Sequence, residues 1–158
     1  MANDGTHGYE LWKYDGTNAP SMVADINPSG NSYPFYLTVF NNELYFRADD
    51  GVHGYELWKT DGTASGTNMF YDIRSGSVQS YIEDLFVFNN ELYFQANDGT
   101  NGDELWKTDG TTAGTTMVDI NPSGNSRPMA LTTFNNELYF VADDGTHGYE
   151  LWKYDGTN

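Results

Sequence analysis

The chain has 158 residues, of which 16% are aromatic, none is cysteine, and 23 acidic side chains face 7 basic ones, for a formal charge of −16. This charge argues against nonspecific binding to nucleic acid or anionic membranes. The lack of cysteine excludes a disulfide framework and a thiol nucleophile, and no apolar run is long enough to span a membrane as a helix.

A repeat of 46 to 48 residues organises the chain. Glu-Leu-Trp-Lys-Tyr/Thr-Asp-Gly-Thr occurs at residues 10–17, 56–63, 104–111 and 150–157, and Phe-Asn-Asn-Glu-Leu-Tyr-Phe occurs at 40–46, 88–94 and 134–140. The leucine of the second segment always precedes the next tryptophan by 14 residues. A period near 45 residues is typical of propeller blades.

Each repeat is predicted to contain four short strands, named a to d in chain order. In the second complete copy, alternating apolar side chains predict strands at residues 83–88, 91–96, 103–108 and 116–120. Asn89-Asn90, between strands a and b, tolerates the positive φ angles of a type I′ turn. Gly99 and Gly102, in the b–c loop, are expected to need positive φ as well.

Four-stranded antiparallel units with aromatic and leucine side chains on both faces predict an all-β fold, a β-propeller whose blades stack on one another. An up-and-down barrel is the rival fold, but nothing repeats at half the observed period. We expect one repeat domain over residues 1–158. It divides into a partial blade at 1–28 (strands c and d), blades at 29–75 and 76–122, and a partial blade at 123–158 (strands a, b and c).

The two ends of the chain carry the same stretch. Residues 2–18 and 142–158 differ only at Asn3 and Asp143, so strand c occurs at both ends and 13 strands are expected where three blades need 12. Propellers close with about four to eight blades, and exposed aromatic faces favour association. We therefore expect closure by homo-oligomerisation into a six-bladed homodimer, in which strands a and b of one chain are completed by c and d of the next. A nine-bladed trimer and an eight-bladed dimer are the alternatives.

Through these motifs the chain resembles a bacterial repeat family named for Glu-Leu-Trp-x-x-Asp-Gly-Thr. All four copies match, together with flanking features such as Asp-Gly-x-His-Gly before the motif and Gly-Thr-x-Met-Val-x-Asp-Ile after it. The resemblance implies propeller blades and a parent protein that is secreted or displayed at the cell surface, and it implies no catalytic residues. No signal peptide is recognised, since Met1 leads directly into the middle of a repeat.

The b–c loops hold the side chains that most resemble a chemical site. His7, His53 and His147 recur there, but Asn101 replaces histidine in the third copy, so we expect a hydrogen bond within the turn instead of acid–base or metal chemistry. Acidic residues precede the glycine of these loops, namely Asp49, Asp50, Asp98, Asp143 and Asp144. We expect them to shape the turns. Bound calcium is the alternative, although no loop has the acidic spacing of an EF-hand.

Two more aspartates recur in every available repeat. Asp15, Asp61, Asp109 and Asp155 lie in the Asp-Gly-Thr turns, and Asp25, Asp72 and Asp119 lie in the Asp-Ile pairs. We expect these carboxylates to accept backbone N–H bonds in buried turns and to hold the blade corners together. A catalytic carboxylate pair would need two distinguished residues at one site, which a repeat does not supply.

The remaining candidates are aromatic and basic. Trp12, Trp58, Trp106, Trp152, Tyr45, Tyr93 and Tyr139 are expected to be mostly core, with sugar stacking as the alternative. Burial of each tryptophan contributes about 2–3 kcal/mol. Lys13, Lys59, Lys107 and Lys153 are expected to pair with nearby carboxylates, at about 0–1 kcal/mol each. Arginine occurs at Arg47, Arg74 and Arg127, and the last two lie in or beside the variable d–a loops with Gln79 and Tyr81, the first place to look for ligand specificity.

Two function classes follow. We favour a non-enzymatic repeat scaffold that assembles by completing blades between chains, whose near-perfect repeats reflect recent duplication or design. The alternative is a multivalent carbohydrate-binding or adhesion module, with several weak equivalent sites acting together. No catalytic residue, metal site or cofactor is predicted, because the non-repeated positions contain no acid–base or nucleophile set.

Overall fold

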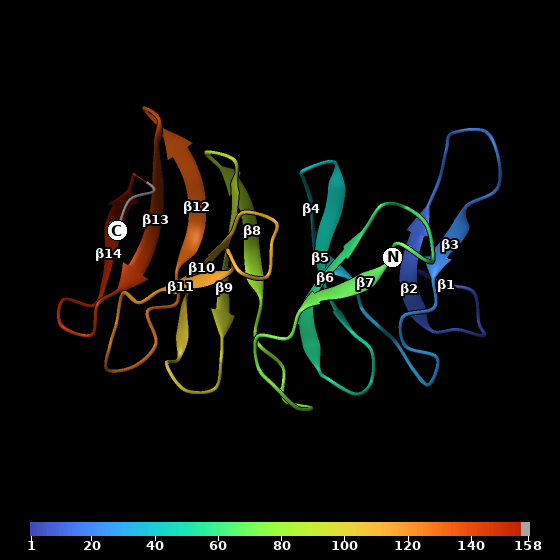
Figure 1. Ribbon diagram of the computed structural model, residues 1–158, viewed down its shortest axis with the longest axis horizontal. Helices are drawn as coiled ribbons and strands as arrows, with labels where there is room; N and C mark the ends of the chain where they lie inside the picture. The colour runs from blue at the N-terminus through green and yellow to red at the C-terminus, as the bar shows by residue number, and fades with distance from the viewer. Residues whose placement is uncertain (156–158) are drawn as a thin grey trace. The chain divides into compact units, whose positions relative to one another are not determined.

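The computed structural model describes residues 1–155. Within that range the chain is all-β, as predicted, with 14 strands in four antiparallel sheets and no helix (Figure 1). No helix suited to crossing a membrane occurs in the described part. The sheets belong to two compact units, one ending at Gln79 and the other beginning at Ser80.

The first unit contains two sheets. The order β1-β2-β3 is built from Ala2–Asn3, Tyr9–Lys13 and Ser21–Ala24. The order β4-β5-β6-β7 is built from Phe35–Phe40, Glu43–Asp49, Tyr55–Thr60 and Asn68–Tyr71. Every strand pairs with its neighbour in sequence, so both sheets are antiparallel meanders.

The second unit repeats this plan. β8 (Glu83–Phe88), β9 (Glu91–Asn97), β10 (Asp103–Thr108) and β11 (Thr116–Val118) form one sheet, and β12 (Met129–Phe134), β13 (Glu137–Asp143) and β14 (Tyr149–Tyr154) form the other. The predicted bounds of strands a and c are confirmed, and strand b runs one residue longer than predicted. Strand d ends two residues early, because the backbone N–H of Ile120 bonds to a side chain instead of to β10.

The structure contains one strand more than the 13 that we predicted. The extra strand is β1, in which Ala2 pairs with Glu10 and Asn3 pairs with Tyr9. The last two residues of β13 pair with β14 in the same register. β1 is therefore the end of a strand b, and two residues are too few to show the alternation that identifies a strand.

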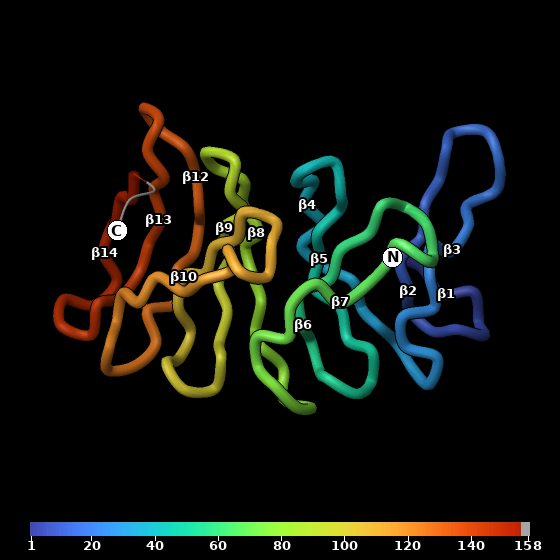
Figure 2. The backbone as a smooth tube through the Cα atoms, viewed as in Figure 1, coloured from blue at the N-terminus to red at the C-terminus, as the bar shows by residue number. Residues whose placement is uncertain are grey.

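Turn residues fix the hairpins that Figure 2 traces. Asn89 and Asn90 have φ angles of 47° and 62°, as a type I′ turn requires. Gly99 and Gly102 have φ angles of 84° and 88°, which confirms the predicted need for glycine. A Cβ on Gly102 would also collide with the carbonyl oxygen of Gly124, so the d–a loop lies directly against the b–c loop.

Each unit buries an apolar core between its two sheets. We call the side of a sheet that carries the leucine of Glu-Leu-Trp the Leu face, and the side that carries the tryptophan the Trp face. The first core joins Leu11, Val23 and Ile26 to Phe46, Ala48 and Trp58. The second joins Phe88, Tyr93 and Leu105 to Leu138, Phe140 and Ala142. In both units the Leu face of one sheet packs on the Trp face of the next, as the cross-strand pairs show.

Candidate functional site

The glutamate of the Glu-Leu-Trp motif ties strand c to the loop that follows strand d. Glu104 is fully buried, and its carboxylate accepts backbone N–H bonds from Ile120 at 2.9 Å, Asn121 at 3.4 Å and Ser126 at 3.0 Å. Burial raises the pKa of this carboxyl, and the hydrogen bonds offset part of that rise. Glu104 therefore holds the d–a loop against strand c from inside the sheet.

The same bonds recur in the first unit. Glu10 accepts from the backbone N–H of Ile26 at 3.0 Å and of Ser32 at 3.1 Å, and Glu56 accepts from Ile73 at 2.9 Å. Sequence reasoning missed this role, although a charged residue at the same place in all four apolar strands was a usable signal. The fourth copy, Glu150, is exposed and makes none of these bonds in the described part of the chain.

The histidines of the b–c loops bond to the turn, as the replacement by Asn101 predicted. The Nδ1 atoms of His7, His53 and His147 lie 2.6, 2.6 and 2.8 Å from Oδ2 of Asp4, Asp50 and Asp144. Asn101 donates to Asp98 at 2.6 Å in the third copy. Each of these aspartates also accepts a backbone N–H bond from the residue two positions later.

These contacts shift the pKa of both members of each His–Asp pair. Hydrogen bonds from the backbone and the ring of His7 lower the pKa of Asp4 to about 2. The bond to Asp4 in turn raises the pKa of His7, and Asp144 does the same for His147. Asp49 and Asp143 shape the same loops by accepting from the N–H of Gly51 at 2.6 Å and of Gly145 at 2.7 Å.

We predict that replacing His7, His53 and His147 together by asparagine keeps the fold and removes a pH dependence of the melting midpoint. A raised histidine pKa stabilises the folded state below the unfolded pKa of 6.5, and this stabilisation is lost as pH rises through the folded value. The melting midpoint of the parent chain should therefore fall between about pH 6 and about pH 8. The triple variant should lack that fall, and an unchanged slope would contradict the assignment.

No group of three or more His, Asp or Glu side chains is placed to hold a metal ion within residues 1–155. The loop carboxylates already accept hydrogen bonds from their own turns.

The aspartates of the Asp-Gly-Thr turns accept local bonds, but the turns are exposed and not buried as we predicted. Asp61 accepts from the N–H of Thr63 at 2.9 Å and from its hydroxyl at 2.7 Å, and Asp109 does the same with Thr111. The c–d turn lies at a sheet end, where water reaches it. Asp155 belongs to the fourth turn, whose residues 156 and 157 lie outside the described range.

The aspartates of the Asp-Ile pairs do not accept the predicted backbone bonds. Oδ1 of Asp25 and of Asp72 is buried without a hydrogen-bond partner among the described residues, and Asp119 is exposed. The reason is competition, because the neighbouring N–H groups of Ile26 and Ile73 donate to the buried glutamates.

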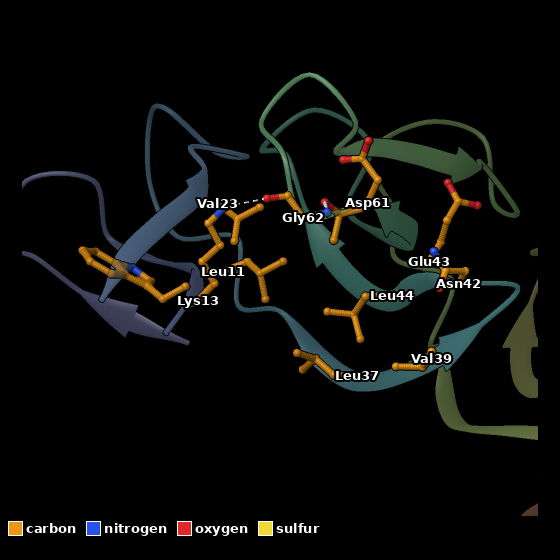
Figure 3. Close-up of a pocket in the computed structure, with 12 residues that line it drawn as sticks. Leu11, Lys13, Val23, Leu37, Val39, Asn42, Glu43, Leu44, Asp61 and Gly62 are labelled. Atoms are coloured by element: carbon orange, nitrogen blue, oxygen red, sulfur yellow. Dashed lines mark hydrogen bonds between the residues drawn. The ribbon is translucent and has the colours of Figure 1, made fainter. Parts of the chain in front are cut away.

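Three of the four motif lysines and most of the aromatic side chains lie as predicted. Lys59, Lys107 and Lys153 pair with Glu43, Glu91 and Glu137 at 2.8, 3.3 and 2.7 Å. Lys13 does not form the predicted carboxylate pair, because β1 pairs only with Tyr9 and Glu10 and does not extend as far as Lys13. Its ammonium group donates instead to the carbonyl oxygen of Gly62 at 2.8 Å (Figure 3). Trp58, Trp106, Tyr45 and Tyr93 are buried, whereas Trp12, Trp152 and Tyr139 are half-buried.

A cation–aromatic cluster occurs around Arg47. Its guanidinium carbon lies 5.6, 5.2 and 4.8 Å from the ring centroids of Phe35, Tyr36 and Tyr55. This cluster was not predicted from the sequence, because its residues belong to three different strands. In the d–a loops that we had singled out, Arg127 lies 3.5 Å from Asp103, Tyr81 is exposed, and Arg74 and Gln79 are half-buried.

The last sheet leaves its Leu face uncovered. Leu151 is 71% exposed, whereas Leu105 and Leu11, at the same place in identical motifs, are 0% and 2% exposed. Phe134 is 60% exposed, whereas its equivalent Phe88 is 4% exposed. Since the local sequences match, the difference comes from the absence of a covering sheet among the described residues.

The first sheet leaves a complementary groove. Leu11 and Val23 face Leu37, Val39 and Leu44 across an open pocket beside β4 and β5 (Figure 3). Val39 is 70% exposed and Leu37 is 48% exposed. In the second unit the equivalent Leu131 and Leu138 share one apolar cluster with phenylalanines of strand a, which the first sheet does not contain.

A second pocket lies beside β14. Its lining includes Val118, Ile120, Trp152 and Tyr154. In the first unit the equivalent place holds Met69 of strand d, which packs on the core cluster. The pocket therefore marks the position of a missing strand d.

Comparisons with protein-family models, with curated proteins and with solved structures gave no match for this chain.

Proposed function

We propose that the chain is a non-enzymatic β-propeller scaffold that closes by homo-oligomerisation, with the partial blades of different copies completing one another. The observation that carries the proposal is the 60% exposure of Phe134 beside the 4% exposure of Phe88 in the same Phe-Asn-Asn-Glu-Leu-Tyr-Phe segment. An uncovered leucine and phenylalanine face of this kind favours association. The resemblance to the Glu-Leu-Trp-x-x-Asp-Gly-Thr family supports a propeller and a secreted or surface-displayed parent.

The open surfaces fit one another when the internal repeats serve as the guide. Phe134 and Tyr139 of one copy would cover Leu37 and Leu44 of the next, as Phe88 and Tyr93 pack with the equivalent Leu131 and Leu138 within the second unit. Met22 pairs with Trp12 across β2 and β3 as Met69 pairs with Trp58. Met22 of a second copy therefore has the right position to fill the pocket beside β14.

Sharing one blade at each junction favours a homodimer. Each chain then provides two complete sheets and two halves, so two copies make six blades, within the range of about four to eight in which propellers close. A trimer would make nine blades. An eight-bladed dimer would need each partial sheet to stand as a blade with one strand missing.

The experiment is a substitution at the groove. Leu37→Asp should leave the single chain folded, because Leu37 is 48% exposed there, and it should weaken association by placing a charge in an apolar contact. Val52→Asp is the matched control, since Val52 is 64% exposed in a b–c loop outside the proposed contact. Native mass spectrometry over a dilution series measures the association of both variants. Equal association of the two variants would count against the proposal.

Carbohydrate binding is the second candidate, favoured by the cluster at Arg47. Phe35 and Tyr36 are 41% and 36% exposed, and both rings lie next to the Arg47 guanidinium, an arrangement suited to stacking on a sugar ring that carries a negative charge. Titration with neutral and uronic-acid oligosaccharides tests it. Tyr36→Ala should abolish saturable binding, and Tyr81→Ala, which changes an equally exposed tyrosine, should not.

A further inference from the structure

We infer that strand β2 of a second copy takes the place of β14 in the shared blade, so that β14 is released while β2 stays with β3. This inference rests on the proposed assembly through shared blades. A blade holds one strand c, yet Tyr-Glu-Leu-Trp-Lys-Tyr occurs both at residues 9–14 and at residues 149–154. Where the two halves of a shared blade meet, one of the two copies of strand c must be displaced from the sheet.

β2 is firmly held by its own unit. Glu10 is fully buried and accepts backbone N–H bonds from Ile26 and Ser32, and it also accepts the hydroxyl of Ser32 at 2.6 Å. Leu11 is 2% exposed in the core of the first unit. Releasing β2 would break all of these contacts within the chain.

β14 is held on one side only. Its six residues pair with β13, and no strand follows on its other edge within residues 1–155. Leu151 is 71% exposed and Glu150 is exposed, so the two positions that anchor β2 contribute little here. Release of β14 therefore breaks fewer contacts than release of β2.

The contacts that β14 does make can be taken over one for one. Lys153 bonds to Glu137 at 2.7 Å, and Tyr154 packs edge-on against Tyr93 with 6.1 Å between ring centroids. Lys13, the last residue of β2, and Tyr14, which follows it, hold the same places in the motif. Tyr14 is 63% exposed, and Lys13 lacks the strand-b glutamate that every other motif lysine has. Exchange therefore gives β2 a partner strand without loss to β13.

Moving β2 and β3 together also preserves their connection. Asp15 accepts the N–H groups of Thr17 at 2.9 Å and Asn18 at 2.8 Å in the turn between them. The intact pair brings Met22 to the pocket beside the vacated strand. Only β1, with two paired residues, must move aside.

Hydrogen–deuterium exchange with mass spectrometry tests the inference on the full chain, at a concentration where the native mass shows the assembly. The exchange is read from peptides that extend beyond the duplicated stretch, residues 10–24 for β2 and residues 138–154 for β14. We expect amides of residues 150–154 to exchange as fast as loop amides, while those of residues 10–13 are as protected as residues 56–60 and 104–108, the internal copies of strand c. Protection of both terminal copies, or of β14 alone, would overturn the inference and leave the proposed assembly standing. A chain that remains monomeric would contradict both the inference and the proposed assembly.

A matched pair of substitutions gives a second readout. Trp152→Ala should leave the melting midpoint of the assembly unchanged, because Trp152 lies on the released strand. Trp12→Ala should lower it and should shift the association toward single chains. Equal effects of the two substitutions, or a larger effect of Trp152→Ala, would overturn the inference.

Discussion

Glu104→Ala is expected to lower the free energy of unfolding by about 3–5 kcal/mol, since each buried donor left without a partner costs about 1–3 kcal/mol. The backbone N–H groups of Ile120 and Asn121 lose their acceptor when the carboxylate is removed, whereas that of Ser126 keeps a bond to the carbonyl oxygen of Asp103 at 2.9 Å. Urea denaturation at one fixed protein concentration measures the change. The effect is large because the glutamate serves a whole loop and not a single bond.

Two controls separate the hydrogen bonds from the side chain's volume. Glu150→Ala makes the same change at an exposed copy of the motif and should shift the unfolding free energy by no more than about 0.5 kcal/mol. Glu104→Gln keeps one oxygen acceptor but turns an NH₂ group toward an N–H donor, so an intermediate loss is expected. Equal losses at positions 104 and 150 would show that the buried network does not stabilise the fold.

Leu105→Ala is expected to cost about 2–5 kcal/mol, the range for removing a buried leucine side chain and leaving a cavity. Leu105 is fully buried between the two sheets of the second unit, where it shares a cluster with Phe88, Tyr93 and Leu138. Those neighbours belong to different strands, so the cavity cannot close by a local shift. Thermal and urea unfolding both report the loss.

Leu151→Ala is the matched control, because Leu151 has the same flanking residues and is 71% exposed. Its cost should be close to zero in the single chain. The cost also stays close to zero in the assembly if β14 is the released strand, whereas retention of β14 would bury Leu151 and make the substitution costly. A loss at position 151 that appears only on assembly would therefore argue for retention of β14.

The sequence predicted the parts of the fold that local chemistry decides. The bounds of β8 and β10, the positive φ angles at Asn89 and Asn90, and the hydrogen bond at Asn101 all follow from short patterns of residue types. The lysine–glutamate pairs also follow, since a lysine of strand c lies across from the start of strand b.

The features that it missed depend on contacts between distant segments. The buried role of Glu104 requires the d–a loop to fold back over strand c, and the aspartates of the Asp-Ile pairs lose their expected partners to that same glutamate. The cluster at Arg47 combines residues from three strands. The difference between Leu105 and Leu151 was inaccessible to local reasoning, because the two motifs are the same and only their surroundings differ.

The native mass of the full chain across a wide range of protein concentrations tests the central claim most directly. The account predicts one species at twice the 17.7 kDa mass of a single chain, with a mass that does not change on dilution through the micromolar range. A species at 17.7 kDa at every concentration would contradict it, because the Leu face of the last sheet and the groove of the first would then remain uncovered in the stable protein.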